Sequence, residues 1–239
     1  MHDRQSVKSP GRAADVTRGV IRWGFKSVVF TVVFAACLFI ASGDRGWGMA
    51  WVYLGVYLVN QIILALVLSP ELLAERSGAQ EGTKPWDLPL AIVAVIVLPL
   101  AMDVVAGLDH RHGWTASLSP GLQVAALVLM AAGIALTTWA MASNAFFSGL
   151  VRIQEDRGQT VVTGGPYRLV RHPGYVGGIV HHLAAPVMLG SWWALIPGGL
   201  GALLLVIRTA LEDRTLQAEL SGYREYAARV RYRLTPGIW

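Results

Sequence analysis

The densest group of residues able to bind or act on a ligand lies in the segment 163–177, which reads Thr-Gly-Gly-Pro-Tyr-Arg-Leu-Val-Arg-His-Pro-Gly-Tyr-Val-Gly. Arg168 and Arg171 can bind a carboxylate, and Tyr167 and Tyr175 can stack on a base or face a cation. The glycines permit close approach of the backbone to a ligand. The structural alternative is a cationic loop with aromatic anchors at the level of lipid headgroups. The combination of residue types favours a binding site.

A second polar group opens the C-terminal tail, 211–239. It contains Glu212 and Asp213, followed by Gly222-Tyr-Arg-Glu-Tyr226. Glu212 lies four residues before Leu216, on the apolar stripe that near-helical spacing gives this segment, so its carboxylate is expected to point inward. The simplest alternative role for Glu212 is an ion pair with Arg208, one helical turn earlier.

The amino-acid composition indicates the kind of protein that contains these two polar groups. Of the 239 residues 54% are hydrophobic and only 15% are charged, against about 25% charged in an average soluble domain. A soluble globule of this size cannot bury so much apolar surface, so a polytopic membrane protein is predicted and an ordinary soluble enzyme is excluded. The single cysteine, Cys37, rules out an intramolecular disulfide and a cysteine-based zinc site, and no metal is expected.

The runs of apolar residues predict where the helices lie. Four runs of about 20 residues, the length needed to cross a bilayer, cover 25–42, 47–68, 88–107 and 121–142. A longer fifth run is interrupted by Gly190 and Ser191, which predicts a helical hairpin with legs 175–189 and 192–210. The predicted fold is therefore all-α, with about five to six transmembrane helices that include this C-terminal hairpin.

Three parts are expected along the chain: a cytoplasmic N-terminal tail, four transmembrane helices, and a catalytic part with the cofactor loop, the hairpin and a C-terminal cytoplasmic helix. Their bounds are 1–22, 23–142 and 143–239.

The basic residues predict the orientation. There are 20 Lys and Arg against 15 Asp and Glu. With the N-terminus in the cytoplasm, 17 of the 20 fall in the cytoplasmic segments 4–26, 76–84, 152–171 and 214–233. Arg45 and Arg111 alone fall on the opposite side. This bias predicts that both termini and both polar groups face the cytoplasm, and it accounts for the excess positive charge without nucleic acid. The Ala- and Arg-rich composition favours a bacterial inner membrane.

Other ionisable and polar residues are weaker candidates. His181 and His182 lie in the first leg of the hairpin, where ionisable groups are functional candidates. Adjacent helix positions point about 100° apart, so both do not easily face one ligand. Asn144, Arg152 and Gln154 precede the 163–177 loop and are candidates for orienting it. The motifs of soluble nucleotide-binding enzymes, zinc proteases and serine hydrolases do not occur in their structural context.

In combination, four motifs resemble the isoprenylcysteine carboxyl methyltransferase family. They are Arg171-His-Pro-Gly-Tyr-Val-Gly177, Glu212-Asp213, Gly222-Tyr-Arg-Glu-Tyr226 and Pro236-Gly-Ile-Trp239. The resemblance is strongest over 144–239 and extends weakly to 69–76 and 82–86. This family belongs to a larger group that includes phospholipid N-methyltransferases, small-thiol S-methyltransferases and sterol reductases.

The resemblance implies S-adenosylmethionine as the methyl donor and an all-helical membrane fold. It places Tyr167, Arg171, His172, Tyr175 and Glu212 around the cofactor. Near the acceptor it places two catalytic residues, Glu225 and Arg231, with Arg233 as a rival for the role of Arg231. The family's usual second glutamate is replaced by Asp213, which leaves the role of that position open.

The residue types agree with methyl transfer. A carboxylate suits the ribose hydroxyls or the ammonium group of the donor, and an arginine suits the donor's carboxylate. The reaction is an in-line displacement in which the protein mainly positions the reactants. A carboxylate acceptor needs no general base, and Arg231 would hold it. An amine or thiol acceptor must lose a proton, for which His172 or Glu225 are the candidate bases.

The expected partner is a lipophilic acceptor that arrives from the bilayer, together with membrane lipids; nucleic acid is not expected. The best candidate is the C-terminal carboxylate of an isoprenylcysteine, and a phospholipid amine or a small thiol are alternatives. A nicotinamide-dependent sterol-reductase-like enzyme is the rival enzyme class, although it usually has more spans ahead of the signature. A non-catalytic membrane scaffold is the rival outside enzymes.

Overall fold

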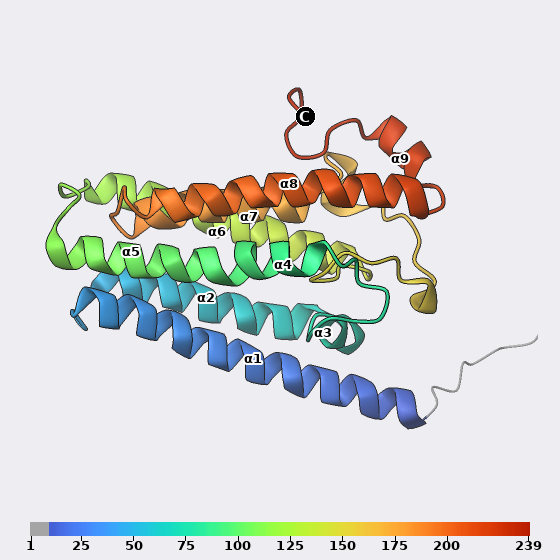
Figure 1. The fold of residues 1–239 in the computed structure, drawn as a ribbon, viewed down its shortest axis with the longest axis horizontal. Helices are drawn as coiled ribbons and strands as arrows, with labels where there is room; N and C mark the ends of the chain where they lie inside the picture. Colours follow the sequence, from blue (N-terminus) through green and yellow to red (C-terminus); the bar gives the residue numbers. More distant parts are fainter. Residues whose placement is uncertain (1–9) are drawn as a thin grey trace, which may run out of the picture.

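The structure, a computed structural model, describes residues 10–239, and this part of the chain contains helices and loops but no strand. The long helices lie side by side in one bundle (Figure 1). Five helices are long and apolar enough to cross a membrane: α1 (Pro10–Ser42), α2 (Gly48–Val67), the continuous stretch of α4 (Asp87–Ile92), η1 (Val93–Val97) and α5 (Leu98–His112), α6 (Pro120–Ser143) and α8 (Leu195–Glu219). The predicted all-α polytopic membrane fold is confirmed.

Large apolar side chains cover the outside of the bundle. Ile40 is 76% exposed and Leu66 is 81% exposed, and many other Val, Leu and Ile side chains on the long helices are exposed as well. A soluble protein rarely shows apolar surface on this scale, so these faces are suited to lipid.

The predicted C-terminal hairpin is formed by α7 (Pro173–Met188) and α8. Between the two helices the chain turns through Gly190, whose φ of 83° lies in the region that favours glycine. With 16 residues α7 is too short to count among the five candidate spans, and it packs against both α6 and α8. A Cβ on Gly177 would collide with the carbonyl oxygen of Gly133 in α6, so the two backbones touch there.

Two helix boundaries differ from those expected. A polar tail is expected over 1–22, but α1 begins at Pro10; residues 1–9 lie outside the described residues. Likewise, α8 continues to Glu219, beyond the expected end at 210. Charged residues end an apolar run, but Arg and Glu are good helix formers and do not end a helix. The helix stops only before Gly222, which has a φ of 79°.

A π-helical segment interrupts the third span. The amide of Leu98 bonds to the carbonyl of Val93 five residues back, and the next residue, Pro99, has no amide proton. The Ala94 carbonyl therefore has no partner at the corresponding position. It lies 3.1 Å from Nε2 of His182 in α7 instead.

The polar segments gather at one end of the bundle. Figure 1 shows α3 (Pro70–Glu75), the 144–172 segment with its short helices η2 (Glu155–Arg157) and η3 (Gly165–Arg168), and α9 (Tyr223–Arg229) together at this end. The turns that hold Arg45 and follow Arg111 lie at the opposite end. The positively charged segments thus share one end, as the charge bias predicts; that this end is cytoplasmic remains a prediction.

Candidate functional site

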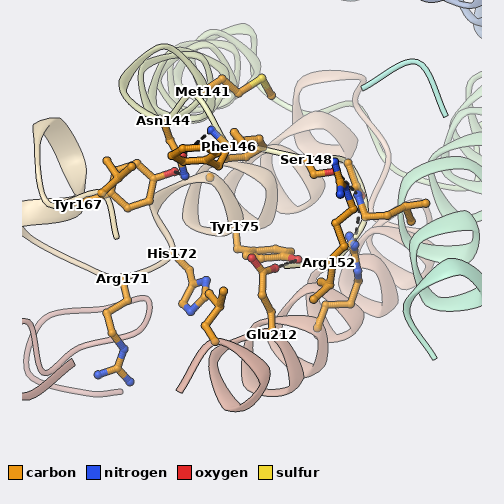
Figure 2. A pocket seen from close by; sticks show the side chains of 18 of the residues that line it. Met141, Asn144, Phe146, Ser148, Arg152, Tyr167, Arg171, His172, Tyr175 and Glu212 are labelled. Atoms are coloured by element: carbon orange, nitrogen blue, oxygen red, sulfur yellow. Dashed lines mark hydrogen bonds between the residues drawn. The ribbon is translucent and has the colours of Figure 1, made fainter. Parts of the chain in front are cut away.

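A cavity of about 350 Å³ lies at the polar end of the bundle. Its walls come from the end of α6, the 144–162 segment, η3, the first turns of α7, the last turns of α8, and α9. Figure 2 shows 18 of the residues that line it. All five residues predicted to bind the cofactor are on this wall: Tyr167, Arg171, His172, Tyr175 and Glu212.

Glu212 and Tyr175 face each other across α8 and α7. The Tyr175 hydroxyl donates a 2.6 Å hydrogen bond to Oε2 of Glu212, as Figure 2 shows. Glu212 is the one acidic residue on the cavity wall, and within the described residues its carboxylate makes no other hydrogen bond. Because an ionised carboxylate can accept about four hydrogen bonds, Glu212 retains capacity for a ligand.

Arg208 forms its direct ion pair with Asp87 and not with Glu212. Its guanidinium forms a bidentate pair with Asp87 of α4, through Nε to Oδ1 at 2.7 Å and Nη2 to Oδ2 at 2.8 Å. The same guanidinium lies 5.5 Å from the ring centre of Tyr175. The ion pair between Arg208 and Glu212 that helical spacing allows is therefore not formed.

Asp213 is fully buried and serves as an anchor behind the cavity. Its carboxylate pairs with Nε of Arg171 at 2.8 Å and Nε of Arg233 at 2.8 Å. It also accepts hydrogen bonds from the side chains of His172, Gln217 and Tyr223. A buried charge is tolerated only when it is paired in this way. Asp213, whose role the sequence left open, thus joins the 163–177 loop, the C-terminal segment and α8.

Arg171 lines the cavity, but its guanidinium bonds to groups outside the cavity. In addition to Asp213, its Nη1 lies 3.1–3.3 Å from the backbone carbonyl oxygens of Ala227, Val230 and Arg231. Figure 2 shows the side chain directed away from the centre of the cavity. Its amide donates to the carbonyl of Tyr232 at 2.9 Å. Arg171 thus fastens the 163–177 loop to the C-terminal segment.

Tyr167 forms a fixed part of the wall. Its hydroxyl accepts a 3.2 Å hydrogen bond from Nδ2 of Asn144 and donates to the carbonyl of Ala140 at 3.3 Å. The Tyr226 hydroxyl donates to the Tyr167 carbonyl at 2.8 Å. Burial raises the pKa of the Tyr167 hydroxyl well above its usual range, so it stays protonated. Asn144 thus contacts the 163–177 loop through Tyr167, and its role in orienting the loop stays a prediction.

The two residues predicted to act on the acceptor are not brought into the cavity. Glu225 and Arg231 are exposed, and neither lines the wall. The rival, Arg233, pairs with Asp213 and stacks over the ring of Trp239 at 4.8 Å. The tail reaches the cavity wall through Tyr223 and Tyr226 of α9 instead. The catalytic roles of Glu225 and Arg231 stay predictions.

The sequence missed Arg76, which follows α3 and also lines the cavity. Its guanidinium carbon lies 5.3 Å from the ring centre of Phe147. The neighbouring Glu75 forms a bidentate pair with Arg152 at 2.8 and 2.9 Å, which attaches α3 to the 144–162 segment. The weak family resemblance over 69–76 was the only signal that α3 belongs to this site.

A second cavity of about 470 Å³ adjoins the first within the apolar part of the bundle. It is enclosed by side chains of α1, α2, α4, η1, α5, α6 and α7, together with Gly149 and Leu150, and no Lys, Arg, Asp or Glu lines it. His181 lines this cavity, and its Nδ1 is buried with no hydrogen-bond partner in the described residues. Six residues line both cavities: Val95, Thr137, Gly149, Leu150, Gly178 and His182. The two spaces are therefore neighbours across a thin wall.

The described residues contain no group of three or more His, Cys, Asp or Glu placed to hold a metal ion.

One segment of the chain is similar to a known protein family. It contains Glu212, Asp213 and part of the lining of both cavities. Residues 122–221 match the phospholipid methyltransferase family. This matched segment runs from α6 to just beyond α8, and it includes the 163–177 loop, Tyr175 and Glu212. The family is related to the isoprenylcysteine carboxyl methyltransferases. The match supports a membrane methyltransferase. No curated protein matches the chain.

Proposed function

We propose that the protein transfers a methyl group from S-adenosylmethionine to a lipophilic acceptor, with the donor bound in the first cavity. The observation that carries this proposal is Glu212, a carboxylate on the cavity wall whose hydrogen-bond partner is Tyr175 and which has no cation partner in the described residues. Bound there, S-adenosylmethionine would supply a methyl group made electrophilic by its sulfonium charge. An unpaired carboxylate next to aromatic rings suits a ligand that carries positive charge and hydroxyl groups.

The remaining wall fits the other parts of such a donor. Phe146, Phe147 and Tyr175 offer ring faces for a purine. The amides of Asn144 and Gln154 on the same wall already bond to Tyr167 and to the Phe146 backbone, so they hold these aromatic residues in place. The volume of about 350 Å³ lies within the usual range of about 300–1,000 Å³ for small-molecule sites.

The second cavity supports a lipophilic acceptor. Its uncharged lining suits an alkyl or isoprenyl chain that enters from the bilayer, and its shared wall at Thr137, Gly178 and His182 would bring the acceptor's reactive end next to the donor. Glycine at 178 leaves the wall thin, because a side chain there would meet Leu205. The protein would contribute mainly by aligning the two reactants and excluding water.

An isoprenylcysteine carboxylate is the first candidate acceptor, on the strength of the motifs shared with that family. A phospholipid amine is the second, and two observations favour it. The matched family is described as phospholipid methyltransferase, and the second cavity has no cation that could hold a carboxylate.

The test is a methyl-transfer assay with purified protein and S-adenosylmethionine labelled in the methyl group. Acceptors are an isoprenylcysteine, a phosphatidylethanolamine and a small lipophilic thiol, each with wild type and Glu212→Gln. We expect label in one lipophilic product with wild type and a strong reduction in the variant. Oxidation of a nicotinamide cofactor without any methyl transfer would support a reductase, and neither activity would support a scaffold.

A further inference from the structure

The arginines that line the first cavity differ in whether they have an acidic partner. Four arginines line this cavity: Arg76, Arg152, Arg171 and Arg208. Three of them are paired with carboxylates of the protein: Arg152 with Glu75 and Asp156, Arg171 with Asp213, and Arg208 with Asp87. Arg76 alone among these four has no acidic partner within the described residues.

Arg76 is also under-satisfied as a hydrogen-bond donor. Its Nη1 atom is buried and has no hydrogen-bond partner in the described residues. A buried donor without a partner costs about 1–3 kcal/mol, and more when it is charged, so such a group in a native structure requires an explanation. Burial lowers the pKa of the Arg76 guanidinium to about 10, which still leaves it cationic at neutral pH.

The position of Arg76 is firmly held. The Ser69 hydroxyl caps α3 by accepting from the amide of Leu72 at 3.2 Å, and the amide of Arg76 bonds to the carbonyl of Leu72 at 3.1 Å. The ring of Phe147 lies beside the guanidinium, and a Cβ on Gly174 of α7 would collide with that ring, so Phe147 is itself tightly packed. The cation is therefore presented from a fixed backbone against a fixed ring.

We propose that Arg76 binds the carboxylate of the methyl donor's amino-acid group. This inference rests on the proposed function, and it assigns a role to α3, which lies outside the segment 122–221 that matches the family. A guanidinium can hold a carboxylate through two parallel hydrogen bonds, which a lysine does not reproduce. Arg76 and Glu212 then complement the two opposite charges of a zwitterionic amino-acid group, and Arg171 serves the fold rather than the donor.

The test compares two ligands, one with the donor's amino-acid group and one without it. S-adenosylhomocysteine carries the amino-acid group, whereas 5′-methylthioadenosine has the same adenosine and a thioether but no carboxylate. Calorimetry measures both affinities for purified wild type, Arg76→Gln and Arg76→Lys. We expect Arg76→Gln to weaken S-adenosylhomocysteine binding roughly 10- to 150-fold, the range for a lost charge-assisted hydrogen bond, and to leave methylthioadenosine binding unchanged. Arg76→Lys should lie between wild type and Arg76→Gln.

Arg214→Gln is the matched control, because Arg214 is exposed on α8 near the cavity and does not line it. It should change neither affinity. The proposal is contradicted if Arg76→Gln leaves both affinities unchanged and raises only the KM for the acceptor, since Arg76 would then bind the acceptor. It is also contradicted if both affinities fall equally, which would indicate a general role in shaping the cavity. Failure of wild type to bind either ligand would instead contradict the proposed function.

Discussion

Glu212 and Asp213 are neighbours in α8, yet they face different surroundings. Glu212 lies on the cavity wall and bonds only to Tyr175 within the described residues. Asp213 is fully buried and has five side-chain partners, which come from α8, α9, the loop before α7 and the segment after α9. Because adjacent helix positions point about 100° apart, one acidic residue is available to a ligand while the next holds the site together.

Asp213→Asn should therefore damage the fold more than any other change in this region. The amide would leave Arg171 and Arg233 without their buried counter-charge, and breaking a buried pair costs about 3–5 kcal/mol. Thermal unfolding of the purified protein in detergent measures the effect. Asp156→Asn is the control, because the Asp156 side chain is 63% exposed and an exposed pair is worth about 0–1 kcal/mol. Equal, small effects in the two variants would contradict the anchoring role of Asp213.

Two glycines in α8 test how tightly the wall between the cavities is packed. A Cβ on Gly201 would collide with the ring of His182, whereas one on Gly199 would meet nothing within 4 Å. Overpacking costs about 1–3 kcal/mol, so Gly201→Ala should lower the thermal unfolding temperature while Gly199→Ala should not. Gly201→Ala should also reduce methyl transfer, because it displaces His182 from the Ala94 carbonyl. An unchanged Gly201→Ala protein would show that α7 and α8 are less closely packed than the structure describes.

The sequence was sufficient to predict the class of fold, because the composition and the apolar runs are direct consequences of a lipid environment. The positions of α2, α6 and the hairpin followed from the same runs. The start of α1 and the end of α8 did not, since charged residues continue a helix beyond the apolar run. The π-helical segment before Pro99 also left no signal in an apolar run.

The site was predicted in part. Tyr167, His172, Tyr175 and Glu212 meet at one cavity, as the spacing of the motifs and the family resemblance imply. The roles of Arg171 and Asp213 could not be predicted, because each depends on contacts with the C-terminal segment that no local pattern encodes. Arg76 was missed for a similar reason: α3 is distant in sequence and reaches the cavity only through packing.

Arg231 offers a direct comparison between sequence and structure. Its side chain is exposed, lies off the cavity wall and makes no hydrogen bond or ion pair in the described residues, while its carbonyl accepts from Arg171 whatever the side chain is. We expect Arg231→Ala to keep kcat/KM within about twofold of wild type, as is usual for a surface substitution. A loss of tenfold or more with unchanged S-adenosylhomocysteine affinity would instead support the acceptor-binding role that the sequence predicts.

The orientation in the membrane is tested by cysteine labelling in intact cells on a Cys37→Ser background. Ser221 lies at the end with the positively charged segments, and Ser117 lies in the turn at the opposite end. A membrane-impermeant thiol reagent should modify Ser117→Cys and spare Ser221→Cys until the cells are opened. The reverse pattern would place the candidate site outside the cytoplasm.

The central claim, that the cavity beside Glu212 binds the methyl donor, is tested most directly by calorimetry with S-adenosylhomocysteine. Wild type should bind one molecule per chain. Glu212→Gln should bind roughly 10- to 150-fold more weakly, because a charge-assisted hydrogen bond is lost, while Glu219→Gln on the exposed end of the same helix should bind as wild type does. Absence of binding to wild type, or equal binding by wild type and Glu212→Gln, would contradict the account.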